Sequence, residues 1–265
     1  MNKFLPFFFL LPFFYSCSEH EMFEWENGIW VDLTHEYSEE TLFWPTSGTF
    51  KIDTVFVGIT DGGFYYESFE FCTAEHGGTH LDAPIHFYEN RKTVHELNLD
   101  QLTGRAVVID VTEQVSQNRD YEFQIADIEN WETEFGEIPD GSILLFNTGM
   151  GAYWPDAEAY LGTDKRGEAG VAELSFPGIH PDTAKWLVEN RTIKAVGLDT
   201  PSLDFGQSQL FESHQILFEQ NIPGFENVAN LHLLPPVGAY IVALPMKIKD
   251  GSGAPLRIVA HIKAL

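Results

Sequence analysis

Residues 75–87 read EHGGTHLDAPIHF and place three histidines and two carboxylates in one short run. Histidines four positions apart can share a helix face, but Gly77 and Gly78 lie between them, and each glycine costs about 1 kcal/mol in a helix. Pro84 would end any helix that began in this stretch. The run therefore predicts an extended segment that can bend, rather than a helix.

Side chains alternate along an extended chain, so His76, His80 and Asp82, which share one parity, can point the same way. Two imidazoles and a carboxylate suit Zn²⁺ or Mn²⁺ and leave coordination positions open for water and substrate. We expect Glu75 and Thr79 to orient the imidazoles. The stretch thus predicts a catalytic metal site.

His86 lies beyond Pro84 and is separated from the three candidate ligands by an expected turn. An imidazole with a pKa near about 6.5 can take a proton from an attacking water and return it to a leaving group. We therefore expect His86 to act as general acid and base. A single histidine is more often a core or surface residue without such a role, but that interpretation explains this dense cluster poorly.

Outside this run, short apolar or β-branched segments bounded by Gly, Pro or Asp predict a sheet. Strands are expected at 30–33, 65–72, 106–111, 142–147, 194–198, 240–244 and 256–262, and helices at 124–135, 181–189 and 214–220. The mixture predicts an α/β fold with a substantial sheet. No repeat or long linker interrupts the chain, so residues 29–265 are expected to form a single domain.

The first residues have the layout of a secretory signal, with an apolar run at 4–15 and Cys17 directly behind Ser16. This arrangement resembles the lipobox of bacterial lipoproteins; an ordinary cleaved signal or a short buried apolar segment is the alternative. We expect residues 1–17 to be a signal peptide and residues 18–28 an acidic tether. The protein would then be exported and anchored to a membrane of the cell envelope only through lipid on Cys17. Cys72 would be the one remaining thiol, which leaves no intramolecular disulfide.

The composition restricts the possible partners. The formal charge of −25, from 40 acidic and 15 basic residues, repels phosphate backbones and argues against nucleic acid binding. Such an excess of acidic residues is most simply explained by a solvated acidic surface. No later apolar run reaches the roughly 18 residues of a membrane helix. A small molecule is the expected partner.

The run from His76 to Phe87 resembles the signature of the cyclase family of metal-dependent hydrolases, which includes kynurenine formamidases and isatin hydrolases. Further blocks resemble that family in the right order at 31–35 (VDLTH), 196–200 (VGLDT), 243–248 (ALPMKI) and 251–257 (GSGAPLR). The resemblance implies a swivelling β/β/α domain, with a mixed central sheet and flanking helices. It also implies a homo-oligomer, either a dimer or a tetramer.

The same resemblance implies a second group of ligands. In the formamidases a His and a Glu twelve positions later, followed by Asn, bind a second metal ion, and His214, Glu226 and Asn227 fit that pattern. Asp82 would bridge the two ions. Judged from the residues alone, His214 could simply cap a helix. The isatin hydrolase branch is similar but mononuclear, with Mn²⁺ and a Gln in place of Glu226. One or two ions of Zn²⁺ or Mn²⁺ are therefore expected, with two favoured.

Substrate contacts follow from the resemblance as well. An aromatic residue of the family's opening loop lines the pocket, and Trp44 occupies that stretch; its indole could stack on an aryl substrate or serve packing alone. Ser202 and Asp204 follow a strand end where the family often has similar residues, and ordinary turn chemistry also explains them. Residues 153–175 could form a lid or an oligomer contact.

These features predict a metal-dependent hydrolase that cleaves the C–N amide bond of a small substrate, such as an aryl formamide or a cyclic amide. The alternatives are a lactone hydrolase or dehydratase on the same scaffold, and a surface lipoprotein that binds metal and ligand without turnover. His86 favours an enzyme, because a binding protein needs no proton shuttle. The expected export argues against kynurenine breakdown itself.

Overall fold

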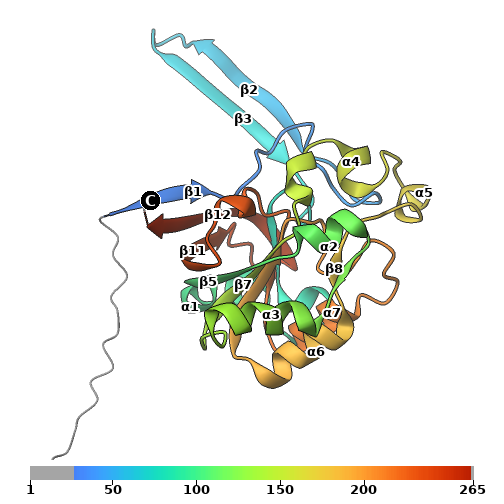
Figure 1. The fold of residues 1–265 in the computed structure, drawn as a ribbon. Coiled ribbons are helices and arrows are strands. Elements are labelled where there is room, and N and C mark those ends of the chain that lie inside the picture. Colours follow the sequence, from blue (N-terminus) through green and yellow to red (C-terminus); the bar gives the residue numbers. More distant parts are fainter. Residues whose placement is uncertain (1–26, 264–265) are drawn as a thin grey trace, which may run out of the picture.

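A mixed sheet of eight strands forms the centre of the computed structural model, which describes residues 27–263 (Figure 1). In spatial order the strands are β1 (Gly28–Asp32), β12 (Gly253–Lys263), β11 (Val237–Pro245), β5 (Thr103–Asp110), β7 (Ser142–Asn147), β9 (Ile193–Leu198), β10 (Gly224–Glu226) and β4 (His80–Asp82). This sheet confirms the α/β class expected from the sequence. The expected signal peptide and lipidation site at Cys17, together with nearly all of the expected tether, lie outside the described residues.

The strands β5, β7, β9 and β10 run parallel and are largely buried on both faces. Alternate residues therefore enter two different cores, so that Leu144 packs in one hydrophobic cluster while Ile143 and Leu145 pack in the other. Three helices cover the first of these faces: α3 (Ile125–Phe135), α6 (Pro181–Asn190) and α7 (Glu212–Glu219). Burial on both faces explains why such strands are continuous apolar runs in the sequence.

The sheet closes on itself through β4, which pairs antiparallel with both β10 and β12. The first residues of β12 pair with β4, and the rest of this long strand pairs with β11 and β1. The second hydrophobic cluster joins the antiparallel strands to the parallel ones, with Phe225, Ile241 and Ile258 fully buried in it. The closure brings β4, which carries candidate ligands, against the short strand β10.

Shorter elements complete the described part of the chain. They are η1 (Pro84–His86), η2 (Val94–Glu96), α1 (Leu99–Leu102), α2 (Thr112–Gln117), η3 (Met150–Tyr153), α4 (Ala157–Leu161), α5 (Glu168–Val171), η4 (Leu231–Leu233) and the paired strands β6 (Glu122–Phe123) and β8 (Gly178–Ile179). Within residues 27–263 no helix has both the length and the apolar character needed to cross a membrane.

All the strands and helices expected from the sequence are present, with their ends displaced by up to three residues. The sequence did not predict β4 and β10, because three residues are too few to show a hydrophobic period. The helix expected to begin at His214 begins at Glu212 instead. His214 therefore lies inside the first helical turn and does not cap the helix.

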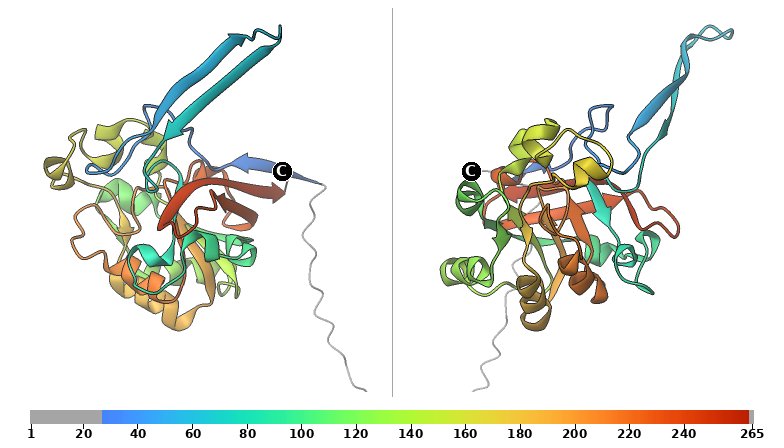
Figure 2. Two further views of the ribbon diagram at one scale, coloured as in Figure 1. Left: turned by 180° about the vertical axis from the view of Figure 1, so that it is seen from behind. Right: turned by 90° about the vertical axis from the view of Figure 1, so that its right-hand side faces the viewer.

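A long hairpin, residues 51–72, leaves the body of the molecule and extends away from it (Figures 1 and 2). Its strands β2 (Lys51–Ile59) and β3 (Tyr65–Cys72) pair antiparallel with each other and with no other described strand. A shift of register between Thr54 and Phe56 disturbs the alternation of β2, which explains why only β3 was predicted. We call residues 51–72 the arm.

Candidate metal centre

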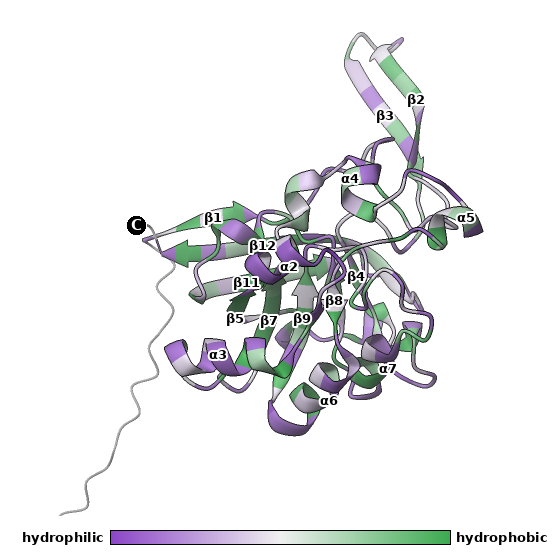
Figure 3. Ribbon diagram, turned by 45° about the vertical axis from the view of Figure 1, so that its right-hand side comes forward, coloured by the Kyte–Doolittle hydropathy of each residue, from purple (hydrophilic) through white to green (hydrophobic). Residues whose placement is uncertain are grey.

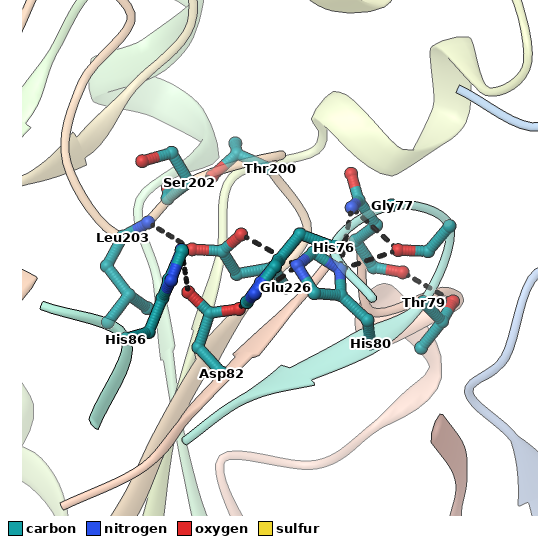
Figure 4. Close-up of polar contacts among 12 residues, drawn as sticks. His76, Gly77, Thr79, His80, Asp82, His86, Thr200, Ser202, Leu203 and Glu226 are labelled. Carbon is teal, nitrogen blue, oxygen red and sulfur yellow. Dashed lines mark hydrogen bonds and ion pairs between the residues drawn. The ribbon is translucent and has the colours of Figure 1, made fainter. Parts of the chain in front are cut away.

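The antiparallel pairing of β4 with β10 sets His80 directly opposite Glu226. His80 and Asp82 are two residues apart on β4, so their side chains leave the same face of the strand. The Nε2 atom of His80 lies 3.2 Å from Asp82 Oδ1 and 3.3 Å from Glu226 Oε2. All three side chains are buried, so the register of two short strands brings an imidazole and two carboxylates together below the surface (Figure 4).

His76 precedes β4 and reaches the same point through a bend at two glycines. Gly77 and Gly78 have φ values of 148° and 57°, which favour glycine. A Cβ atom on either glycine would lie within 2.7 Å of an aromatic side chain. The expectation of an extended segment that bends at its glycines is thus confirmed, with the bend at Gly77 and Gly78 and the extended part at residues 80–82. The bend places His76 Nδ1 2.7 Å from Asp82 Oδ1.

A hydrogen-bonded chain behind His76 fixes which ring nitrogen faces the centre. The Ser252 hydroxyl donates to Glu75 Oε2 at 2.6 Å, so Ser252 Oγ accepts from His76 Nε2, which lies 3.0 Å away. A proton on Nε2 leaves Nδ1 unprotonated and directed at Asp82. Gly253 makes room for this ring, because a Cβ atom there would lie 2.4 Å from it. Glu75 reaches the imidazole only through Ser252, which the sequence analysis did not single out.

His80 is oriented by the backbone of its own loop. Its Nδ1 donates to the Gly78 carbonyl at 2.9 Å, and Asn227 Nδ2 donates to the same oxygen at 2.7 Å. In the neutral ring Nε2 therefore carries the lone pair, and this buried atom has no hydrogen-bond partner among the described residues. Thr79 does not orient an imidazole as expected; its hydroxyl donates to the Asn227 carbonyl and ties β4 to the loop behind it.

His214 brings a third imidazole from the first turn of α7. Its Nδ1 lies 2.5 Å from Asp204 Oδ2, so this carboxylate accepts the Nδ1 proton, and in the neutral ring Nε2 is the nitrogen with the lone pair. Nε2 lies 3.1 Å from Glu226 Oε1 and 3.5 Å from Asp82 Oδ2. In the sequence, the preference of aspartate for turns was enough to explain Asp204 without a role in the site. No spacing rule joins a loop residue to a helix residue ten positions later, so the contact becomes visible only in the fold.

In its neutral form each of the three imidazoles thus directs an unprotonated nitrogen at the oxygens of Asp82 and Glu226. Lone pairs that face each other at these distances repel unless a cation or a proton lies between them. The donors form two groups, His76–His80–Asp82 and Asp82–His214–Glu226, and within each group the ligand atoms lie within 4.8 Å of one another. Imidazole nitrogens and carboxylate oxygens in such sets suit Zn²⁺ or Mn²⁺. The side chains therefore fit a divalent metal.

The ionisation of these groups supports the same interpretation. Burial lowers the pKa of His80, but Asp82 and Glu226 outweigh that effect and raise it to about 10. Burial also opposes the charged form of His214, yet its carboxylate neighbours raise its pKa well above the usual value. Burial raises the pKa of Asp82, but the surrounding imidazoles hold it well below its usual range. The buried carboxylates therefore favour positive charge close to them, which a divalent cation would supply.

His86 lies beside the ligands without joining either group. Its ring stacks on that of His76, with centroids 3.7 Å apart and planes inclined by 15°. Its Nε2 lies 3.9 Å from Asp82 Oδ2, beyond hydrogen-bond distance. Burial lowers the pKa of His86 to about 4, so the imidazole is neutral at pH 7. The side chain faces the cavity described next.

A cavity of about 240 Å³ has the ligand cluster as its polar part. Its other walls are mainly apolar, formed by Leu42, Phe43, Trp44, Phe87, Leu161, Pro201 and Phe211. Ser202 also lines it, whereas Lys and Arg are absent from the described residues around it. Trp44 lies in the wall and also packs edge-on against Phe211, with centroids 6.1 Å apart. The position of Trp44 therefore permits either role, stacking on an aryl substrate or packing alone.

The segment 153–175 supports one wall of this cavity. Leu161 lines the cavity directly. Arg166 donates hydrogen bonds to the backbone carbonyls of Phe43 and Ser47, and the Gly167 N–H donates to the Pro45 carbonyl at 2.9 Å. The segment therefore holds residues 43–47 in place beside the ligand cluster.

Comparisons with known proteins agree with this geometry. The Cyclase family model matches residues 31–205. Isatin hydrolase from Roseibium aggregatum is 29% identical over 211 residues, which are 77% of each chain. Kynurenine formamidase from Bacillus cereus is 26% identical over 231 residues, covering 87% of this chain and 96% of the relative.

Solved structures give the same result. Isatin hydrolase A from Ralstonia solanacearum has a TM-score of 0.78 at 31% identity, with 89% of this chain and 92% of that chain covered. An isatin hydrolase bound to the product analogue thioisatinate has a TM-score of 0.79 at 26% identity, with 90% and 94% covered. The chain belongs to the cyclase family of metal-dependent hydrolases.

Proposed function

We propose that this protein hydrolyses the C–N amide bond of a small, uncharged aryl substrate, using a divalent cation held by His76, His80 and Asp82. Its relatives are named for the hydrolysis of isatin and of a kynurenine formamide. They do not favour the lactone hydrolase, dehydratase or binding-only alternatives. The observation that carries the proposal is the convergence of three imidazoles and two carboxylates at one end of an apolar cavity.

A divalent cation in this centre would supply Lewis acidity, which polarises a carbonyl group and lowers the pKa of water. His86 is placed to move the proton, because its neutral ring faces the cavity and its Nε2 lies 3.9 Å from Asp82 Oδ2. The imidazole takes a proton from the attacking water and returns it to the leaving nitrogen. The water oxygen bonds to the carbonyl carbon as the C–N bond breaks, so one water is added across the amide.

The cavity walls support a substrate that is flat, apolar and without a net negative charge. Phe43, Trp44 and Phe87 offer aromatic faces and edges against which an aryl ring can pack. The cavity of about 240 Å³ is smaller than the roughly 300 Å³ at which pockets for drug-sized ligands begin. With no cationic side chain among its described lining residues, the cavity offers no ion-pair partner to an amino-acid carboxylate.

The proposed site holds two ions, because Asp82 belongs to both ligand groups and Glu226 supplies a second carboxylate. Zn²⁺ and Mn²⁺ are the candidate ions. Metal analysis of the purified protein should give about two ions per chain, and a Glu226→Gln variant should lose one of them. One ion per chain in both proteins would contradict the two-ion proposal while leaving the hydrolase proposal intact.

Turnover assays test the activity directly. The Zn²⁺-loaded and Mn²⁺-loaded proteins should hydrolyse isatin or N-formyl aryl amines, and should act poorly on aliphatic amides and on N-formylkynurenine. A His80→Ala variant should lose both metal and turnover. Fully loaded protein that hydrolyses none of these amides, or that prefers lactones, would contradict the proposal.

The cellular location and the assembly belong to the same proposal. We place the protein in the cell envelope, anchored by lipid on Cys17 and assembled as a homo-oligomer. The support for the anchor is the apolar run at 4–15 followed by Ser16 and Cys17. A lipid analogue should label the wild type, whereas a Cys17→Ala variant should remain unlabelled and leave the membrane fraction. Absence of label on the wild type would contradict lipidation.

A further inference from the structure

Tyr160 is a buried tyrosine that lies close to the metal centre without lining the cavity. It belongs to α4, on the side of the body from which the arm extends (Figures 1 and 3). Its side chain has no exposed surface. The next residue, Leu161, lines the cavity, whereas Tyr160 does not. A polar group buried in this way needs a hydrogen-bond partner, so the contacts of the hydroxyl indicate what it does.

The Tyr160 hydroxyl donates into the loop that follows the candidate ligand Glu226. Its oxygen lies 2.8 Å from Asn227 Oδ1 and 3.0 Å from the Asp199 carbonyl oxygen. Both of these oxygens can only accept, so the hydroxyl supplies the proton. Burial raises the pKa of Tyr160 well above its usual value, which keeps that proton in place. The contact therefore holds the oxygen of the Asn227 amide on the side of Tyr160 and directs the amide nitrogen away from it.

The nitrogen of this amide meets the hydrogen bond that orients His80. Asn227 Nδ2 donates to the Gly78 carbonyl at 2.7 Å, and the same oxygen accepts the Nδ1 proton of His80. We propose that Tyr160 is a positioning residue for the metal centre, which acts through the Asn227 amide to fix the ring of His80. The proposal rests on the metal centre of the proposed function and not on its substrate.

An Asn227 amide turned the other way would disturb His80. Its oxygen would then face the Gly78 carbonyl oxygen, and two acceptors 2.7 Å apart repel. That oxygen would take the place of Nδ2, 3.5 Å from His80 Nδ1, and would compete with Gly78 for the imidazole proton. A ring drawn towards it would move Nε2 relative to the two carboxylates of the centre. The Tyr160 hydroxyl opposes this turn, because the turned amide would present N–H groups to it instead of an acceptor.

Contacts that do not involve the hydroxyl keep Tyr160 in place. The Arg119 guanidinium donates to the backbone carbonyls of Ala159 at 2.6 Å, Tyr160 at 3.1 Å and Ser175 at 2.8 Å. The Tyr160 ring packs edge-on against Trp154, with centroids 5.3 Å apart. We therefore expect Tyr160→Phe to leave α4 where it is and to remove only the hydrogen-bond donor.

The Zn²⁺ affinity of the full chain tests the proposal by titration against a competing chelator. Tyr160→Phe should raise the Kd about 10–100-fold, the typical loss when a supporting contact of a metal ligand is removed. Tyr121→Phe is the matched control, because its hydroxyl donates to Asp127 Oδ2 at 2.8 Å outside the site, and it should keep the wild-type Kd. Equal Kd values for Tyr160→Phe and the wild type would overturn the positioning role alone. A wild type that does not bind Zn²⁺ would overturn it together with the metal centre.

A double-mutant cycle tests whether Tyr160 acts through Asn227. Asn227→Gly removes the amide, and glycine tolerates the φ of 52° at this position. The double variant with Tyr160→Phe should bind Zn²⁺ as weakly as Asn227→Gly alone, because the hydroxyl then has no amide to hold. Losses that add in the double variant would overturn the route through Asn227.

The visible spectrum of the Co²⁺-loaded protein keeps the proposal testable if Asn227→Gly fails to fold. The absorption bands of Co²⁺ depend on the geometry of its ligands, so Tyr160→Phe should shift them and Tyr121→Phe should not. A structural hydroxyl would lower the Tm in either variant without changing the spectrum. Identical spectra for the wild type and Tyr160→Phe would therefore overturn the proposal. None of these measurements uses turnover, so the result does not depend on the proposed hydrolysis.

Discussion

The guanidinium of Arg166 holds the backbone of Phe43, with Nη1 donating to the Phe43 carbonyl oxygen at 3.1 Å. Its other amino group, Nη2, donates to the Ser47 carbonyl. The two acceptors lie on either side of Trp44 in the chain, so one side chain from the 153–175 segment fixes the loop that forms the aromatic wall. The planar guanidinium spans two carbonyls in a way that a lysine ammonium does not.

Arg166→Ala should therefore weaken substrate binding more than it slows the chemistry. Loss of hydrogen bonds from a charged donor costs roughly 1.5–3 kcal/mol each, part of which the loop recovers by moving, so we expect KM for aryl amides to rise about tenfold. The kcat should change little, because the ligands and His86 are untouched. Arg166→Lys should give an intermediate KM, and Lys165→Ala is the control. A fall in kcat at constant KM would contradict this role.

His86→Phe should keep the aromatic stack on His76 and remove the proton-transfer group. General acid–base catalysis contributes typically about 10²–10⁴-fold, so kcat should fall within that range. Metal content, measured by mass spectrometry, should not change, because His86 belongs to neither ligand group. His232→Phe is the control. Wild-type turnover in the His86 variant would remove the proposed role.

Ser252→Ala should weaken metal binding, because it removes the acceptor that holds His76 Nε2 and the link to Glu75. Loss of such a supporting contact typically costs about 10–100-fold in metal affinity. Titration against a competing chelator would measure the change. Glu75→Gln, whose amide oxygen can still accept from Ser252, should have a smaller effect. Unchanged affinity in Ser252→Ala would show that the contact does not orient the ring.

Removal of metal should destabilise the folded protein, since the buried Asp82 and Glu226 lose the cation that separates them from imidazole lone pairs. At a metal concentration of 100 times Kd, binding contributes about 2.7 kcal/mol. For a domain of this size that corresponds to a rise in Tm of roughly 5–10 °C, measured by calorimetry with and without chelator. An Asp82→Asn variant should not respond to metal. An equal response in both proteins would place the stabilising ion elsewhere.

His35 should make the protein less stable in mild acid. Burial lowers its pKa to about 4, its Nε2 is buried without a hydrogen-bond partner, and its ring stacks on Trp154 at 4.3 Å. The unfolded chain takes up a proton below about pH 6.5, whereas the folded chain resists it until about pH 4. The free energy of unfolding should therefore fall as the pH drops through this window. Its slope against pH should be no steeper than the binding of one extra proton by the unfolded chain gives.

A His35→Phe variant keeps the stack and cannot titrate, so its stability should fall less steeply than that of the wild type over the same pH range. Denaturant unfolding at several pH values would measure the two slopes. The metal ligands titrate in both proteins and cancel in the difference. Parallel slopes would show that His35 does not contribute.

The sequence predicted the sheet well where the hydrophobic period is long enough to be recognised. The buried strand β7 and the helices α3 and α6 have clear apolar patterns, and the structure confirms them. It predicted no strand at β4, because residues 80–82 carry the chemistry of the site and not a strand composition. Their extended conformation comes from pairing with β10 and β12, which lie far away in the chain.

The sequence by itself determined which residue types gather near His80, because a run of closely spaced histidines and an aspartate is a local property of the chain. Only the tertiary structure decided which nitrogen of each imidazole faces inward. Those choices depend on long-range contacts, such as that of His76 with Ser252, 176 positions away. The cavity wall also depends on a long-range contact, because Arg166 binds the Phe43 carbonyl from 123 positions away in the sequence. Local spacing fixes what a segment can offer, whereas packing between distant segments fixes how each group is oriented.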